Sequence, residues 1–115
     1  MDEIEIKAIS KYTPISPQKV RLVMDQVRGK GVNEALAMLQ LMPKAAARPV
    51  YKAVRAAVAN AEHNEDLDRE DLYIARITAD GGPTRRWRRF GARGRFKPIR
   101  KRSSHITVVL KERET

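Results

Sequence analysis

A 22-residue segment, residues 81–102, carries the entire net charge of this chain. It reads GGPTRRWRRFGARGRFKPIRKR and holds eight Arg and two Lys but no Asp or Glu. The whole sequence has 24 basic and 14 acidic residues and a formal net charge of +10, so the rest of the chain holds 14 residues of each sign. Because ten neighbouring cations repel one another, we expect this segment to be poorly ordered until phosphates neutralise it. The chain should therefore consist of an electroneutral body, about residues 1–80 and 103–115, and a basic arm, about residues 81–102.

Length and composition restrict the class of protein further. The 115 residues make about one domain, and 42% of them are hydrophobic, enough for one modest core. The absence of cysteine excludes disulfides, thiolate metal ligands and a cysteine nucleophile. The longest apolar runs are far shorter than the roughly 20 residues that span a bilayer, and the first five residues, MDEIE, are acidic where a secretory signal is basic. We therefore expect a single domain, residues 1–115, in the cytoplasm, with a polyanion as partner.

The first expected helix begins at Ser16-Pro17, which combine an N-cap serine with a proline at the first helical position. Gly29 and Gly31 supply the end of this helix. Its apolar stripe, at the i, i+3, i+4 and i+7 spacing of one helix face, consists of Val20, Val23, Met24 and Val27.

Two more helices are expected before the acidic segment at residues 62–71. Asn33 is a candidate N-cap for the second helix, which covers residues 34–42 and ends before Pro43. The third covers about residues 44–64, and Pro49 lies one turn inside it, so we expect either a kink at Pro49 or a later start. The alanine-rich surface of the third helix would let other helices approach closely.

Alternating apolar and polar residues predict strands at residues 4–12, 72–80 and 104–111. The last two flank the basic arm and form a hairpin with a very long connection, which is typically functional or disordered. With about ten residues in each direction, at roughly 3.3 Å per residue, the arm would reach on the order of 30 Å, and Gly91 and Gly94 would serve its turn. The expected fold is α+β, a small three-stranded antiparallel sheet with three helices and a long protruding basic β-hairpin.

The chemistry of the basic arm favours RNA as its partner. Trp87, Phe90 and Phe96, half of the six aromatic residues, are interleaved with arginines. Aromatic rings and guanidinium planes stack on unpaired bases, and arginine binds phosphate oxygens through two parallel hydrogen bonds. A solvated charge run or a localisation signal is the plainer interpretation, but such a signal needs far fewer cations and no interleaved aromatic residues. The candidate RNA-binding residues of the arm are Arg85, Arg86, Arg88, Arg89, Arg93, Arg95, Lys97, Arg100, Lys101 and Arg102, with Trp87, Phe90 and Phe96 as candidate stacking residues.

The start of the first helix is a second candidate phosphate site. Ser16-Pro-Gln-Lys-Val-Arg21 combines free backbone N–H groups, the positive end of a helix dipole and the cations Lys19 and Arg21. The same residues are equally consistent with a capped amphipathic helix whose Lys19 and Arg21 are solvated. Composition alone does not separate these two interpretations.

Neither a catalytic nor a metal-binding constellation stands out. His63 and His105 are the only histidines, and neither has a partner at ligand spacing. Asp66-x-Asp68-x-Glu70 begins like a calcium loop, but Asp71 stands where an EF-hand has glycine, and no glutamate follows at the last position. The six acids of residues 62–71 are expected to form a solvated loop that faces away from RNA. We therefore expect no enzyme, no cofactor and no metal.

Two other kinds of nucleic-acid protein remain as alternatives. An architectural DNA-binding protein also combines a compact body with basic β-arms, but it predicts a homodimer and duplex bending, and this chain lacks an obvious dimer seam. An enzyme acting on nucleic acid needs acids beside the arm, whereas residues 62–71 lie at its far end if residues 72–80 pair with 104–111. No membrane partner is expected, because the arm lacks a helical apolar face.

Five motifs occur in order and at consistent spacing over essentially the full chain: Ser16-Pro-Gln-Lys-Val-Arg21, Ala59-Asn-Ala-Glu-His-Asn64, Gly82-Pro83, Ala92-Arg-Gly-Arg95 and Lys101-Arg-Ser-Ser-His-Ile106. Together they resemble the bacterial type of the large-subunit ribosomal protein number 22 family. The resemblance implies a body on the outer surface of the large subunit and a hairpin threaded through its 23S-type rRNA, with the tip at the wall of the nascent-peptide exit tunnel. It also implies help in subunit assembly, a tip where changes confer macrolide resistance, and a monomer on the cytoplasmic ribosome that meets neighbouring ribosomal proteins and the nascent polypeptide.

Carried over by motif, the resemblance places the hairpin tip at about Arg85–Gly91, with the aromatic residues of the arm stacked on bases or facing the tunnel. The chain departs from the family pattern at Phe90-Gly91, where Pro-Arg is frequent, and at Pro49 in the third helix. The resemblance assigns rRNA contacts to Ser16, Lys19 and Arg21 at the first helix and to Arg93, Arg95, Lys101 and Arg102 on the returning side of the arm.

Overall fold

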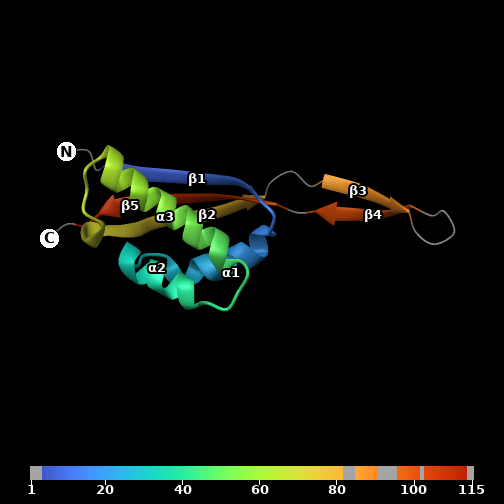
Figure 1. The fold of residues 1–115 in the computed structure, drawn as a ribbon, viewed down its shortest axis with the longest axis horizontal. Coiled ribbons are helices and arrows are strands. Elements are labelled where there is room, and N and C mark those ends of the chain that lie inside the picture. The colour runs from blue at the N-terminus through green and yellow to red at the C-terminus, as the bar shows by residue number, and fades with distance from the viewer. Residues whose placement is uncertain (1–3, 82–84, 91–95, 102, 114–115) are drawn as a thin grey trace.

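The computed structural model describes residues 4–81, 85–90, 96–101 and 103–113, and Figure 1 shows them as a body from which a hairpin extends. The strands and helices occur in the order expected from the sequence, and one additional short helix precedes the second strand. The elements are β1 (Glu5–Thr13), α1 (Pro17–Val27), α2 (Val32–Leu41), α3 (Ala47–Asn64), the 3-10 helix η1 (Arg69–Asp71), β2 (Leu72–Gly81), β3 (Arg85–Phe90), β4 (Phe96–Lys101) and β5 (Ser104–Glu112).

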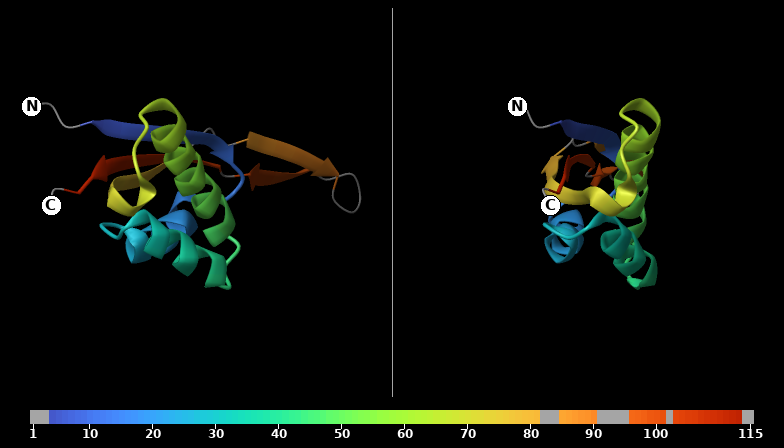
Figure 2. Two further views of the ribbon diagram at one scale, coloured as in Figure 1. Left: turned by 60° about the vertical axis from the view of Figure 1, so that its left-hand side comes forward. Right: turned by 90° about the vertical axis from the view of Figure 1, so that its left-hand side faces the viewer.

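Strand β5 is the centre of a three-stranded antiparallel sheet with the order β1-β5-β2. Its Leu110 is fully buried and lies between Ile6 of β1 and Ile74 of β2. Since side chains alternate along a strand, the core residues of all three strands lie on one face, whereas Ile9 and Val109 lie on the other. Helix α3 crosses the face of the core, and α1 and α2 complete the core beside β2 (Figures 1 and 2). The expected α+β architecture is therefore confirmed.

Helix α1 follows the sequence pattern closely, whereas α2 begins earlier than expected. All four stripe residues of α1 are buried. The N-cap of α2 is Gly31, and its carbonyl accepts a 2.9 Å hydrogen bond from the backbone N–H of Ala35. Asn33 is thus an exposed residue inside the helix, and its prediction as the N-cap was wrong. The earlier start has a packing reason, since it puts Val32 on the same buried face as Ala35 and Leu39.

Pro49 marks a later start of the third helix rather than a kink. Helix α3 begins at Ala47, so Pro49 is its third residue and lies in the first turn. The backbone N–H groups of a first turn have no partner within the helix, so a residue without an N–H costs little there.

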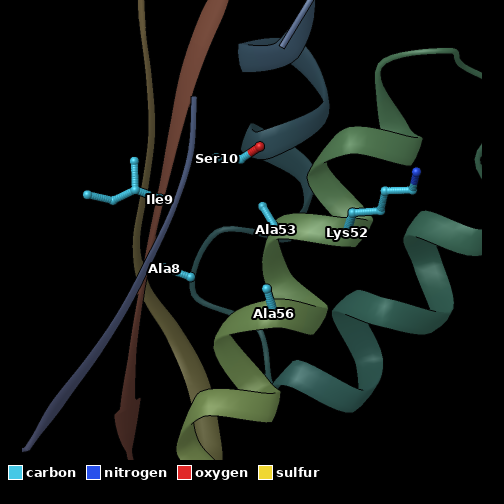
Figure 3. A pocket seen from close by; sticks show the side chains of 6 residues that line it. All are labelled: Ala8, Ile9, Ser10, Lys52, Ala53 and Ala56. Atoms are coloured by element: carbon cyan, nitrogen blue, oxygen red, sulfur yellow. The ribbon is translucent and has the colours of Figure 1, made fainter. Parts of the chain in front are cut away.

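The small side chains of α3 face strand β1 as well as a neighbouring helix. Figure 3 shows Ala53 and Ala56 pointing towards Ala8 of β1, with Ile9 directed to the other side of the sheet. These residues border a shallow hollow of about 210 Å³. The close approach expected of the alanine surface therefore involves the sheet in addition to α2.

Strands β3 and β4 form a separate two-stranded sheet that extends the molecule along its long axis (Figure 1). The extents of the molecule are 67 × 28 × 20 Å and its radius of gyration is 17.3 Å. A compact chain of this length has a radius of gyration of about 13 Å, so the difference reflects the protruding hairpin. None of the described helices is long and apolar enough to cross a membrane.

Replacing Gly29 with alanine should destabilise the body by about 1 kcal/mol, measured as the free energy of unfolding in urea. Gly29 has a φ of +82°, and a Cβ added to it would meet no atom within 4 Å, so the cost comes from the backbone alone. Gly31→Ala is the matched control, because Gly31 has a φ of −60° and its Cβ would meet the flexible end of Arg113 at 3.4 Å and the Leu72 carbonyl at an ordinary contact distance of 3.8 Å. Equal effects at both positions would refute the backbone explanation.

Candidate nucleic-acid interface

The start of α1 lies at the root of the basic arm. Gly81, the last residue of β2, pairs with Ser104, the first residue of β5. The buried Ser104 hydroxyl donates a hydrogen bond to the carbonyl of Ile15, which immediately precedes the helix start. Pro17 lies against Gly81, since a Cβ on this glycine would be 3.9 Å from Pro17 Cγ. The fold thus brings together the two segments that the sequence proposed as phosphate sites, as Figure 1 shows.

Arg21 binds the outer edge of β2. Its Nε and Nη2 donate hydrogen bonds of 3.1 and 2.7 Å to the carbonyl of Ala79. Arg28, the C-cap of α1, donates a 3.0 Å hydrogen bond from Nη2 to the carbonyl of Ile77. Its Nη1 also donates a hydrogen bond to the carboxylate of Asp25. Both carbonyls belong to an edge strand and would otherwise have no partner in the sheet. Arg21 therefore fixes the strand that leads into the arm, while the other N–H groups of its guanidinium remain available.

Ser16 and Lys19 lie where the sequence placed them, at the first turn of α1. Ser16 is the N-cap, but its side chain makes no capping hydrogen bond, and only its carbonyl bonds to the helix, at 3.3 Å from the N–H of Val20. Lys19 is exposed and forms no ion pair among the described residues. The first turn of the helix therefore offers its backbone N–H groups and the Lys19 ammonium at the root of the arm.

In the basic arm, three of the six paired positions bring two cations opposite each other. Arg85 pairs with Lys101, Arg86 with Arg100, and Arg89 with Lys97. Like charges that are directly opposite on neighbouring strands destabilise a sheet, so bound anions would stabilise the hairpin. The other pairs are Trp87 with Ile99, Arg88 with Pro98, and Phe90 with Phe96, while the predicted site residues Arg93, Arg95 and Arg102 lie outside the described residues.

The acids of residues 62–71 lie at the opposite end of the sheet from the arm. Leu72, which follows this segment, pairs with Glu112, whereas the arm begins beyond the pair Gly81–Ser104 at the other end of β2. Within the segment, Arg69 Nη2 donates a 2.7 Å hydrogen bond to Glu62. This bond lowers the pKa of Glu62 and raises that of Arg69. The molecule thus has an acidic end and a basic end.

Among residues 4–81, 85–90, 96–101 and 103–113, no three His, Asp or Glu side chains are grouped so as to hold a metal ion. The segment Asp66–Glu70 instead contains a local hydrogen bond of 3.0 Å, donated by the N–H of Glu70 to the carboxylate of Asp68. Asp66 has a φ of +57°, the conformation of a tight turn. The geometry of this segment is that of a turn leading into η1.

Comparison with known proteins gives a family. The sequence model of Ribosomal protein L22p/L17e matches residues 8–111. The chain is 52% identical over 110 residues to the large ribosomal subunit protein uL22 of Desulfitobacterium hafniense, covering 96% of both chains. The uL22 of Clostridium acetobutylicum is 51% identical over 111 residues, with 96% of this chain and all of the relative covered, and that of a Synechococcus species is 51% identical over 107 residues, covering 93% and 87%.

The chain belongs to the L22p/L17e family of ribosomal proteins. The five motifs that suggested this family lie on α1, α3, the arm and the start of β5, and the one on α3, residues 59–64, lies at the end of that helix next to the acidic segment. The resemblance to the bacterial type is confirmed.

In this member of the L22p/L17e family, the strand pairing contradicts the predicted position of the hairpin tip. The sequence placed the tip at about Arg85–Gly91, but Arg85–Phe90 is the outgoing strand β3, and its last residue pairs with Phe96. The predicted tip is therefore a strand, and the segment that joins Phe90 to Phe96 lies outside the described residues. The reason is that the positions of charges do not reveal register, which depends on the pairing of both strands.

Sequence reasoning also missed Arg28 as a partner of β2. The available signal was its distance of seven residues from Arg21, which places both guanidinium groups on one side of α1. No sequence pattern, however, indicates that this side faces carbonyls 49 and 58 residues later.

Proposed function

We propose that this chain is a structural component of the large ribosomal subunit that binds large-subunit rRNA through the basic arm and the start of α1. The observation that carries the proposal is the pairing of cation with cation at three of six positions in the arm. Such a hairpin is stabilised when phosphates lie along it, and rRNA supplies phosphates at high density. The relatives from three bacterial genera are named as large ribosomal subunit proteins, which supports the same role.

The finer details of the role form part of the same proposal. The body would lie on the surface of the subunit beside neighbouring ribosomal proteins, and the arm would pass through 23S-type rRNA to the wall of the exit tunnel, near the nascent polypeptide. The 67 Å length of the molecule supports a contact far from the body. The arm would gain order during subunit assembly in the cytoplasm. One copy of the chain would join each ribosome, and it would act as a structural component rather than as an enzyme.

Sedimentation of a gentle cell lysate through a sucrose gradient tests the proposal. The chain should migrate with the large subunit at low salt and remain there in high salt, because an arm enclosed by folded rRNA cannot leave without disrupting the rRNA around it. Migration with chromosomal DNA would instead indicate an architectural DNA-binding protein, and migration as free protein would rule out an integral ribosomal component.

A further inference from the structure

The outer face of α3 carries cations that pair with no acid among the described residues. Arg48, Lys52 and Arg55 are exposed and lie four and three residues apart, hence on one side of the helix. Lys44, just before the helix, is also exposed. None of these four side chains forms an ion pair or a hydrogen bond within the described part of the chain. The charges of the body sum to zero, but they are unevenly distributed, because six of its 14 acids belong to residues 62–71.

A hollow of about 260 Å³ lies between α2 and α3, beside these cations. Tyr51 of α3 is half-buried in its wall, and the Tyr51 hydroxyl accepts a 3.1 Å hydrogen bond from Gln40 Nε2 of α2. This bond and the packing of Tyr51 against the core hold the ring in place. The hollow is lined by Leu39, Gln40, Met42, Lys44, Ala47, Arg48 and Tyr51.

The lining has the chemistry of a site for an unpaired nucleotide. An aromatic ring provides a stacking surface for any base, and Lys44 and Arg48 on the rim supply donors for phosphate oxygens. A basic protein tail would be repelled by the two cations, and a purely apolar ligand would leave them uncompensated. Leu41 is 85% exposed nearby, but it does not line the hollow.

We infer that an unpaired nucleotide of large-subunit rRNA occupies the hollow between α2 and α3, with its base on Tyr51 and its phosphate on Lys44 and Arg48. The inference rests on the proposed function and adds to it a contact made by the body, apart from the arm and the start of α1. Lys52 and Arg55 extend the cationic face along α3 and would bind the phosphates that follow in the same strand.

Salt titration of binding to transcribed 23S-type rRNA tests the two cations in the full chain. Lys44→Gln combined with Arg48→Gln should make the slope of log affinity against log salt shallower by about 1.4, because two phosphate contacts to a single strand are lost. The matched control is Lys30→Gln combined with Arg113→Gln, which removes the same charge near the acidic end. Its slope should change much less, and equal slopes in the two double variants would overturn the inference.

The aromatic wall is tested with Tyr51→Leu, which keeps apolar bulk and removes the stacking surface. Affinity for the same rRNA should fall roughly five- to hundredfold, the effect of losing one stacked base. The control is Tyr73→Leu, whose ring faces Arg113 at 5.8 Å instead of the hollow. Circular dichroism melts of every variant separate loss of binding from loss of folding, and an unchanged affinity for a folded Tyr51→Leu would contradict the stacking role.

Ultraviolet crosslinking of intact large subunits gives an independent readout. A nucleotide adduct is expected on the tryptic peptide Ala45–Lys52, which contains Tyr51. A crosslink from this peptide to another protein, or no nucleotide adduct, would count against the inference. If the full chain shows no salt-dependent rRNA binding at all, the proposed function fails; if it binds but the α3 variants behave like their controls, only the inference fails.

Discussion

A chain in which Asn-Gly replaces residues 83–102 should fold normally and lose most of its salt-dependent affinity for large-subunit rRNA, keeping only the part that α1 and α3 supply. Gly81 and Ser104 are paired, so the replacement leaves a four-residue loop, Gly82-Asn-Gly-Ser103, of a length common in hairpins. Strands β3 and β4 pair only with each other, so no strand of the body loses a partner. The deletion also removes ten cations and leaves 14 basic and 14 acidic residues.

The expected size of the loss follows from counterion release. A protein that makes six to ten phosphate contacts loses about 10³- to 10⁵-fold in affinity between 50 and 200 mM salt, and the shortened chain should show only a shallow dependence. An intermediate variant with Gln at Arg85, Arg86, Arg88 and Arg89 keeps the arm and should reduce the slope by about 3. If circular dichroism shows that the shortened chain is unfolded, the division into body and arm is wrong. If the shortened chain keeps the full salt slope, the arm does not bind the rRNA.

Leu110→Ala should cost about 3 kcal/mol of unfolding free energy and lower the melting temperature by more than about 10 °C. Leu110 is fully buried on the central strand, and its loss leaves a cavity between Ile6 and Ile74 that the sheet cannot close without disturbing both outer strands. Leu41→Ala removes the same atoms from a side chain that is 85% exposed and should change stability by less than about 0.5 kcal/mol. Urea titration measures both, and similar losses would show that the core is not centred on β5.

The elements of this fold were largely predictable because their signals are local. The four-residue stripe of α1 and the alternation in β2 and β5 each reflect burial of one face. The buried residues match these patterns except at Val109 of β5, which is buried on the other face. The start of α2 was missed because Asn33 is a good cap by type, whereas the helix is positioned by the burial of Val32. Packing against distant elements overrode the local preference.

The composition of the candidate interface was predictable from the sequence, but its geometry was not. The charge of residues 81–102 follows from the sequence alone, whereas the turn between Phe90 and Phe96 depends on register. Arg21 was proposed as a phosphate ligand from its place near a helix start, but its bond to Ala79 joins residues 58 positions apart. The cations of α3 were hidden in the zero total of the body, because a net charge gives no information about where opposite charges lie.

The arginines of α1 also determine how this sheet can meet another copy of itself. Along the outer edge of β2, Arg21, Arg28 and the turn after α1 occupy the carbonyls of Ala79, Ile77 and Ile74. A second chain that adds a strand at this edge therefore meets three acceptors that are already bound. The other edge, β1, carries the exposed Lys7 and Lys11, and two such edges placed together would bring their lysines into mutual repulsion. Both edges of the sheet thus resist the strand-to-strand pairing through which free copies of the chain would aggregate.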